Sequence, residues 1–233
     1  MDAARAPYLL SLIFFSFPVL AQVNANYCGP LAGGHFGPYD YRSDYYVGEP
    51  GDQESHQSKR GLVDGAHFTR RVELLLGAQS GGQIGLPGAD LNYTLKAFPN
   101  HHRALMSVMR YGEKQKSNKP EGLQYDVECY FERAVRFQPN DAVARMLYAT
   151  YLTKNNRVPE AVAQLEFSTV VAKDNAFTHY NIGLVYFDMK NYGKALAQAH
   201  RAQALGFERT ELRELLKGVK QWQEPVAETK PQQ

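Results

Sequence analysis

The C-terminal half of the chain repeats its pattern of small residues at a spacing of 34. Ala149 and Gly183 are 34 residues apart, and the same spacing separates Ala161 from Ala195. A period of this length is typical of helix-turn-helix units stacked on one another. Two antiparallel helices pack closely only where Gly or Ala on one leaves room for a large side chain on the other. The sequence therefore predicts an all-α domain.

The unit from Ala176 to Gly206 shows the pattern most clearly, with the sequence AFTHYNIGLVYFDMKNYGKALAQAHRAQALG. Its small and large residues resemble those of the tetratricopeptide repeat (TPR) family. The matching positions are Ile182, Gly183 and Tyr186 in the first helix, and Ala195, Ala199 and Ala202 in the second. The resemblance covers roughly residues 99–222 and implies a superhelix of about three helix-turn-helix repeats.

Earlier segments continue the same register. The unit from Ala142 to Asn175 is more degenerate, but its first helix keeps Tyr148, Ala149 and Leu152. Another 34 residues back, second-helix positions are occupied by Val127, Phe131 and Ala134. The first helix of this earliest repeat is expected to run from Pro99, in its first turn, to Tyr111.

The remaining segments divide the chain into four parts. Residues 1–25 precede an irregular N-terminal arm over residues 26–90, in which one short helix is expected from Thr69 to Leu76 and a Gly-rich loop from Gly77 to Gly88. The helical domain covers residues 91–222, and a disordered tail follows over residues 223–233. One helical stripe predicts a capping helix on the last repeat; it comprises Leu212, Leu215, Leu216, Val219 and Trp222.

The N-terminus has the pattern of a cleavable signal peptide. The apolar run Tyr8–Leu20 follows a short segment with Arg5, and cleavage after Ala21 fits as well as cleavage after Ala25. The run is shorter than the about 20 residues that span a bilayer, and Pro18 interrupts it. We therefore expect a periplasmic or secreted protein that is not an integral membrane protein.

The two cysteines, Cys28 and Cys129, are expected to form a disulfide, because export exposes thiols to an oxidising compartment. Two unrelated thiols are the alternative. Cys129 lies on its helix beside Val127 and Phe131 rather than in line with these core-facing residues. We therefore expect Cys129 to face outward, where the arm can reach it.

The resemblance also implies a function, because TPR arrays bind peptides or protein segments on the concave surface that their first helices line. On the expected geometry, this groove is lined by Val143, Met146, Thr150, Thr153, Lys154, Phe177, Tyr180, Asn181, Leu184, Phe187 and Asp188. Related arrays use an Asn at the place of Asn181 to hold a ligand carboxylate. Met146 and Leu147 replace the polar and cationic residues of that mode, so we do not expect it here.

The sequence thus predicts a non-enzymatic adaptor that binds a segment of another envelope protein, similar to the small exported TPR proteins of Gram-negative bacteria. One alternative is a structural component whose arm fills its own groove, and another is an enzyme using the N-terminal segment. No metal-ligand spacing or cofactor motif is present, and the adjacent His101 and His102 are expected to cap or line a helix start. The net charge of +2 gives no basis for a nucleic-acid partner.

Overall fold

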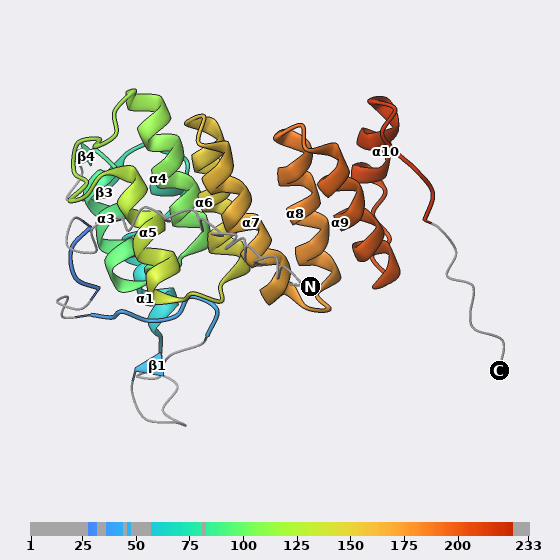
Figure 1. Ribbon diagram of the computed structural model, residues 1–233. Helices are drawn as coiled ribbons and strands as arrows, with labels where there is room; N and C mark the ends of the chain where they lie inside the picture. The colour runs from blue at the N-terminus through green and yellow to red at the C-terminus, as the bar shows by residue number, and fades with distance from the viewer. Residues whose placement is uncertain (1–27, 32–35, 44–45, 48–56, 81–82, 226–233) are drawn as a thin grey trace, which may run out of the picture.

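The computed structural model describes residues 28–31, 36–43, 46–47, 57–80 and 83–225 of the chain. The predicted signal peptide and residues 226–233 of the predicted tail lie outside these ranges. Within them the chain is mainly helical, which confirms the all-α prediction. Figure 1 shows the helices as a row, with α3, α4 and α5 at one end, α6 and α7 in the middle, and α8, α9 and α10 at the other end.

The helices and strands have the following bounds. The helices are α1 (Lys59–Ala66), α2 (Arg70–Glu73), α3 (Gly88–Ala97), α4 (His102–Gln115), α5 (Val127–Phe137), α6 (Ala142–Lys154), α7 (Val158–Ala172), α8 (Ala176–Asp188), α9 (Tyr192–Ala204) and α10 (Glu211–Gly218). Two short antiparallel ladders pair β1 (Tyr46–Val47) with β2 (Gln57–Ser58), and β3 (Ala78–Ser80) with β4 (Gln83–Gly85).

Polar side chains fix the starts of the C-terminal helices. Asp141, Asn175 and Asn191 each accept a hydrogen bond from a backbone N–H in the first turn of α6, α8 and α9, respectively. Such a cap satisfies a donor that the helix itself leaves unpaired, and its loss costs about 1 kcal/mol. In α7, Pro159 occupies the first turn, where a missing N–H is tolerated.

Small residues let the helices pack closely, most extensively between α6 and α7 and between α8 and α9. Ala149, Ala161 and Ala195 are fully buried. Gly183 makes the closest approach, because a Cβ atom there would lie 2.5 Å from Cδ2 of Leu212. Glycine at this position therefore allows α10 to close on α8.

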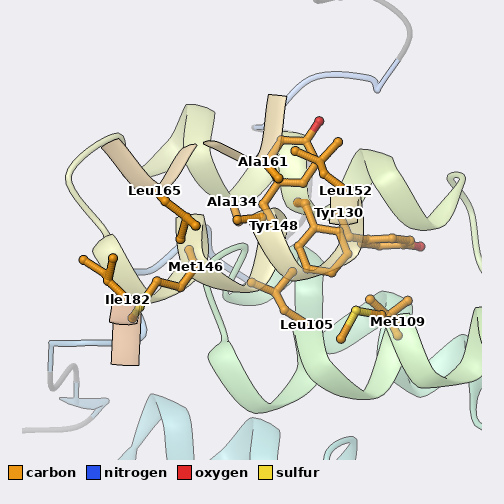
Figure 2. Packing of buried hydrophobic residues seen from close by; sticks show 14 of the residues in the cluster. Leu105, Met109, Tyr130, Ala134, Met146, Tyr148, Leu152, Ala161, Leu165 and Ile182 are labelled. Atoms are coloured by element: carbon orange, nitrogen blue, oxygen red, sulfur yellow. The ribbon is translucent and has the colours of Figure 1, made fainter. Parts of the chain in front are cut away.

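One continuous core joins these helices. Its buried apolar side chains extend from Phe68 to Leu216. In Figure 2, Met146 of α6 points toward Leu165 of α7 and Ile182 of α8, so that three helices meet around one side chain. Helices α2 to α10 thus share this core, and Val63, Ala97 and Phe98 form a second, smaller cluster beside it.

The N-terminal helices differ from the predictions. Thr69 caps α2 as expected, but this helix ends at Glu73 rather than Leu76. Sequence analysis placed α1 and the first three residues of α3 in the irregular arm over residues 26–90, and the loop expected over Gly77–Gly88 contains the paired strands β3 and β4. The Gly and Pro residues in these segments hid their helical periodicity.

Pro99 does not begin a helix, which corrects the predicted helix Pro99–Tyr111. It lies in the turn after α3, and α4 begins at His102 with His101 as its N-cap. The His101 Nδ1 atom accepts a hydrogen bond from the Ala104 N–H at 3.1 Å. The prediction that His101 caps its helix is therefore confirmed.

The predicted disulfide between Cys28 and Cys129 is present and ties the N-terminal arm to α5. Cys129 lies outside the main apolar core, which includes Val127 and Phe131, and faces the arm as predicted; only 2% of it is exposed. The arm covers it. Beside the disulfide, the buried Arg133 guanidinium donates hydrogen bonds to the carbonyl oxygens of Cys28 at 3.1 Å and Pro30 at 2.6 Å.

A buried polar junction anchors the next part of the arm. The Asn100 side-chain amide donates to Asp40 at 2.7 Å and to Asp141 at 2.8 Å, and its oxygen accepts from the Tyr41 N–H at 2.9 Å. Arg42 binds both carboxylate oxygens of Asp40. Although burial opposes it, hydrogen bonds from Arg42 and Asn100 lower the pKa of Asp40 to about 2. Asn100 thus connects the arm, the α3–α4 turn and the start of α6.

His101 lies next to this junction and is fully buried. Because Nδ1 accepts the capping hydrogen bond, Nε2 carries the proton and donates to Asp64 of α1 at 2.9 Å. The ring packs against Tyr41, with the ring centroids 4.0 Å apart. Burial lowers the pKa of His101 below its ordinary value of 6.5, so the neutral ring is the form that fits this site.

Replacing both cysteines, Cys28→Ser with Cys129→Ser, is expected to lower the free energy of unfolding. The bond closes a loop with a sequence separation of 101 residues, and the chain-entropy model puts the loss at up to about 4 to 5 kcal/mol. Denaturant unfolding of the oxidised wild type and the variant measures the difference. Reductant should destabilise the wild type and leave the variant unchanged; equal stability of all forms would contradict the prediction.

His101 is expected to make stability depend on pH. Below about pH 6.5 the unfolded chain binds a proton that folded His101 resists, so the free energy of unfolding falls with falling pH, by at most about 1.4 kcal/mol per pH unit. His101→Asn keeps a capping oxygen but does not titrate. Denaturant titrations between about pH 5 and 7 should show a smaller slope for this variant. A variant that keeps the wild-type slope would show that His101 does not cause it.

Candidate protein-binding groove

The predicted groove residues of α6 have limited access to solvent. Val143, Thr150 and Thr153 are half-buried, and the two hydroxyls donate to backbone carbonyls of their own helix. Lys154 is exposed and forms an ion pair with Glu113 of α4 at 2.6 Å. Met146 is only 7% exposed and belongs to the core, which corrects its assignment to the groove surface.

On α8 the predicted residues separate into an exposed set and an interior one. Phe177 is 56% exposed, Leu184 and Phe187 are half-buried, and Asp188 is exposed. The Asn181 amide donates to the Phe177 carbonyl oxygen at 2.7 Å, within its own helix. These residues lie on the face of α8 that sequence analysis assigned to the groove.

Tyr180 is a correction, because only 3% of it is exposed. Its ring packs against Phe207 with the centroids 4.7 Å apart, and its hydroxyl donates to the Glu211 carboxylate at 2.9 Å. Burial is the main cause that raises the pKa of Tyr180, and the hydrogen bond to Glu211 adds to it. Tyr180 therefore joins α8 to α10 beneath the surface.

A hollow of about 690 Å³ lies between α8 and α10. We call it the α8–α10 groove. Leu184 and Phe187 line it from α8, and Leu215 and Val219 line it from α10. Leu215 is 43% exposed and Val219 is 38% exposed. Apolar side chains left open to solvent within one hollow are typical of a binding surface.

The side of α10 that faces the groove is one helical stripe. Its residues are Glu211, Glu214, Leu215, Gly218 and Val219, at intervals of three and four. Sequence analysis placed Leu215 and Val219 together with Leu212 and Leu216 on a single capping stripe. Leu212 and Leu216 are buried where α10 packs on α8 and α9, whereas Leu215 and Val219 face the groove. The exposed pair follows the buried pair by three residues, so the periodicity of the sequence assigned all four residues to one helical stripe.

The charged residues that line the α8–α10 groove are Glu211 and Glu214. Their side chains are 71% and 60% exposed. Glu214 pairs with Lys217 at 3.0 Å, and Arg209 lies 3.8 Å from Glu211. Exposed pairs of this kind are worth little and leave the carboxylates available to a ligand.

A second hollow of about 200 Å³ lies between α4 and α6. It contains Met109 and Tyr151, but also the charged side chains of Glu113, Lys116 and Lys154. It is smaller than the α8–α10 groove, and its charges are of both signs. This hollow is therefore the weaker candidate for an apolar ligand.

The described part of the arm lies away from the α8–α10 groove. Cys28 to Pro30 contact α5, while Tyr39 and Tyr41 bond to the end of α3 and the α3–α4 turn. Arg42 reaches the α5–α6 turn through Gln138. Within residues 28–31 and 36–43, the arm thus contacts α3, α5 and the turns that follow these two helices.

The described ranges contain neither a candidate metal site nor a helix that could span a membrane. No three His, Cys, Asp or Glu side chains there come together as a metal ion would require. Among the helices of the same ranges, none has the length and apolar character needed to cross a bilayer. A comparison of the chain with protein-family models found no match, and a comparison with curated proteins found no significant one.

Tyr180→Ala is expected to cost far more stability than Leu215→Ala. Tyr180 is a buried aromatic side chain, and truncating one costs about 3 to 5 kcal/mol. Leu215 is 43% exposed, so its truncation should cost about 1 kcal/mol or less. Denaturant unfolding of the two variants measures both losses. Equal losses would contradict the division into core and groove residues.

Proposed function

We propose that this protein is a TPR-like array that binds a segment of another protein in the α8–α10 groove. The helix bounds support the repeat. α6 and α8 both have 13 residues, and α8 begins and ends 34 positions after α6. α9 likewise begins 34 positions after α7. Buried residues recur at the same spacing, as in Tyr148 and Ile182, or Ala149 and Gly183.

The flanking helices extend this register. Val127, Phe131 and Ala134 of α5 are buried and precede Ala161, Leu165 and Ser168 of α7 by 34 positions. Leu212 and Leu216 of α10 follow Thr178 and Ile182 of α8 at the same spacing. α10 therefore takes the place of a first helix, and the groove between α8 and α10 corresponds to the ligand-binding side of a TPR array.

Export to the periplasm or the cell exterior belongs to the proposal. The apolar run Tyr8–Leu20 supports it, and so does the disulfide between Cys28 and Cys129. Disulfides form and persist in oxidising compartments and are rare in reducing ones. The partner is then a protein of the cell envelope or of the exterior.

The observation that carries the binding proposal is the partial exposure of four apolar side chains within one hollow. Leu184, Phe187, Leu215 and Val219 come from two helices and converge on the same space. A partner segment that packs its own apolar side chains against these four residues would remove both sets from water. The removal of apolar surface from water is the main driving force of association. Because the described arm contacts the N-terminal helices, we favour a partner over an arm that fills the groove.

Crosslinking in cells that export the protein tests the proposal. We expect Leu215→Ala with Val219→Ala to lose the partner that the wild type captures, as identified by mass spectrometry. Gly218→Leu should also lose it, because open space surrounds the position of its Cβ atom and a larger side chain would obstruct the groove. Circular dichroism should show wild-type helicity for both variants.

Val158→Ala with Val170→Ala is the matched control. Both residues are exposed apolar residues of α7, at 44% and 75%, and neither lines the groove. This variant should capture the partner as the wild type does. Retained capture in the α10 variants would overturn the assignment of the groove.

A further inference from the structure

We infer that the α8–α10 groove selects a basic amphipathic segment, one that carries Lys or Arg beside its apolar residues. This inference rests on the proposed function and adds the chemical class of the partner. It comes from the charge of the groove rather than from its apolar character. The two charged residues of its lining, Glu211 and Glu214, are both carboxylates.

The charges and the apolar residues occupy different ends of the α10 stripe. Glu211 and Glu214 lie in the first turn of the helix, and Gly218 and Val219 lie at its end. The hydrogen bond from Tyr180 and the close approach of Gly183 to Leu212 place the first turn of α10 beside the middle of α8. A ligand that buries apolar residues against Phe187 and Val219 therefore presents its other end to the two carboxylates.

A cationic side chain suits this end for an electrostatic reason. Glu211 and Glu214 are both acidic, and a Lys or Arg of a ligand would be attracted to them and would exclude part of the water around them on binding. An acidic segment would meet repulsion at the same place. Lys217 and Arg209 reduce the field but are themselves exposed, with 42% and 68% of their side chains accessible.

The smaller hollow between α4 and α6 does not share this property. Its charged lining residues are Glu113, Lys116 and Lys154, and Lys154 already pairs with Glu113. A charged lining that is wholly acidic therefore distinguishes the α8–α10 groove from the α4–α6 hollow. A groove that attracts cations is also opposite in charge preference to the carboxylate-binding mode that sequence analysis set aside at Asn181.

Binding of two model peptides to the full exported protein tests the inference. Both are amphipathic helices with the same leucine positions; one carries lysines on its polar face and the other carries glutamates. We expect the leucine–lysine peptide to bind at least about tenfold more tightly by fluorescence anisotropy, and the difference to shrink with added salt. Equal affinity for both peptides would overturn the inference.

Three variants identify the source of the preference. Glu211→Gln with Glu214→Gln should lose most of it, because the shape of the groove stays and its charge is removed. Glu166→Gln with Asp174→Asn removes two exposed carboxylates that do not line the groove, and it should keep the preference. Leu215→Ala with Val219→Ala should weaken binding of both peptides. An unchanged preference in the Glu211/Glu214 variant would mean that other acidic surface attracts the lysine peptide.

The crosslinking experiment separates failure of this inference from failure of the proposed function. If Leu215→Ala with Val219→Ala loses the cellular partner while Glu211→Gln with Glu214→Gln retains it, the groove binds a partner but does not select it by charge. If both variants retain the partner, the groove itself is not the binding site.

Discussion

Close approach between helices at small residues is the constraint on which the rest of the structure depends. Ala149, Ala161 and Ala195 are fully buried, and at Gly183 even one additional carbon atom would meet Leu212. A large side chain at any of these positions would separate two helices along their whole length, because packed interiors have little free volume. The main core and the position of α10 against α8 both follow from this packing.

The arm is held by a different kind of interaction. The disulfide bonds the arm covalently to α5. Beside it the buried Arg133 side chain donates a hydrogen bond to a backbone carbonyl of the arm, and the buried Asn100 amide donates to the carboxylates of Asp40 and Asp141. Buried polar groups cost free energy unless they are paired, so each donor strongly favours one position of the arm. The result is an arm that covers Cys129 and the α3–α4 turn, far along the row of helices from α10 (Figure 1).

Because the described part of the arm lies far from α10, apolar residues at the C-terminal end of the row of helices stay open to solvent. Leu212 and Leu216 of α10 are buried where this helix packs on α8 and α9, whereas Leu215 and Val219 face the groove together with Leu184 and Phe187. A helix that both closes a core and presents a second apolar face is typical of a surface that another molecule covers. The carboxylates of Glu211 and Glu214 at one end of that face supply the polarity of the groove.

The 34-residue spacing determined the helix order, and the caps Asp141, Asn175 and Asn191 mark helix starts that are readable from local residue type alone. The disulfide was also predictable, since the chain has only two cysteines. These features depend on neighbours in sequence or on composition. The helix α1 and the start of α3 escaped prediction because Gly and Pro within or beside them weaken a local signal that long-range packing restores.

Only the tertiary structure decided which residues of α6, α8 and α10 are exposed. Met146 and Tyr180 lie on the expected helix faces, yet the neighbouring helices cover them. Leu215 and Val219 belong to the expected capping helix, yet its rotation turns them toward the groove. Periodicity specifies which residues share a helix face, but the rotation and spacing of neighbouring helices depend on side chains far away in sequence, such as Leu212 against Gly183.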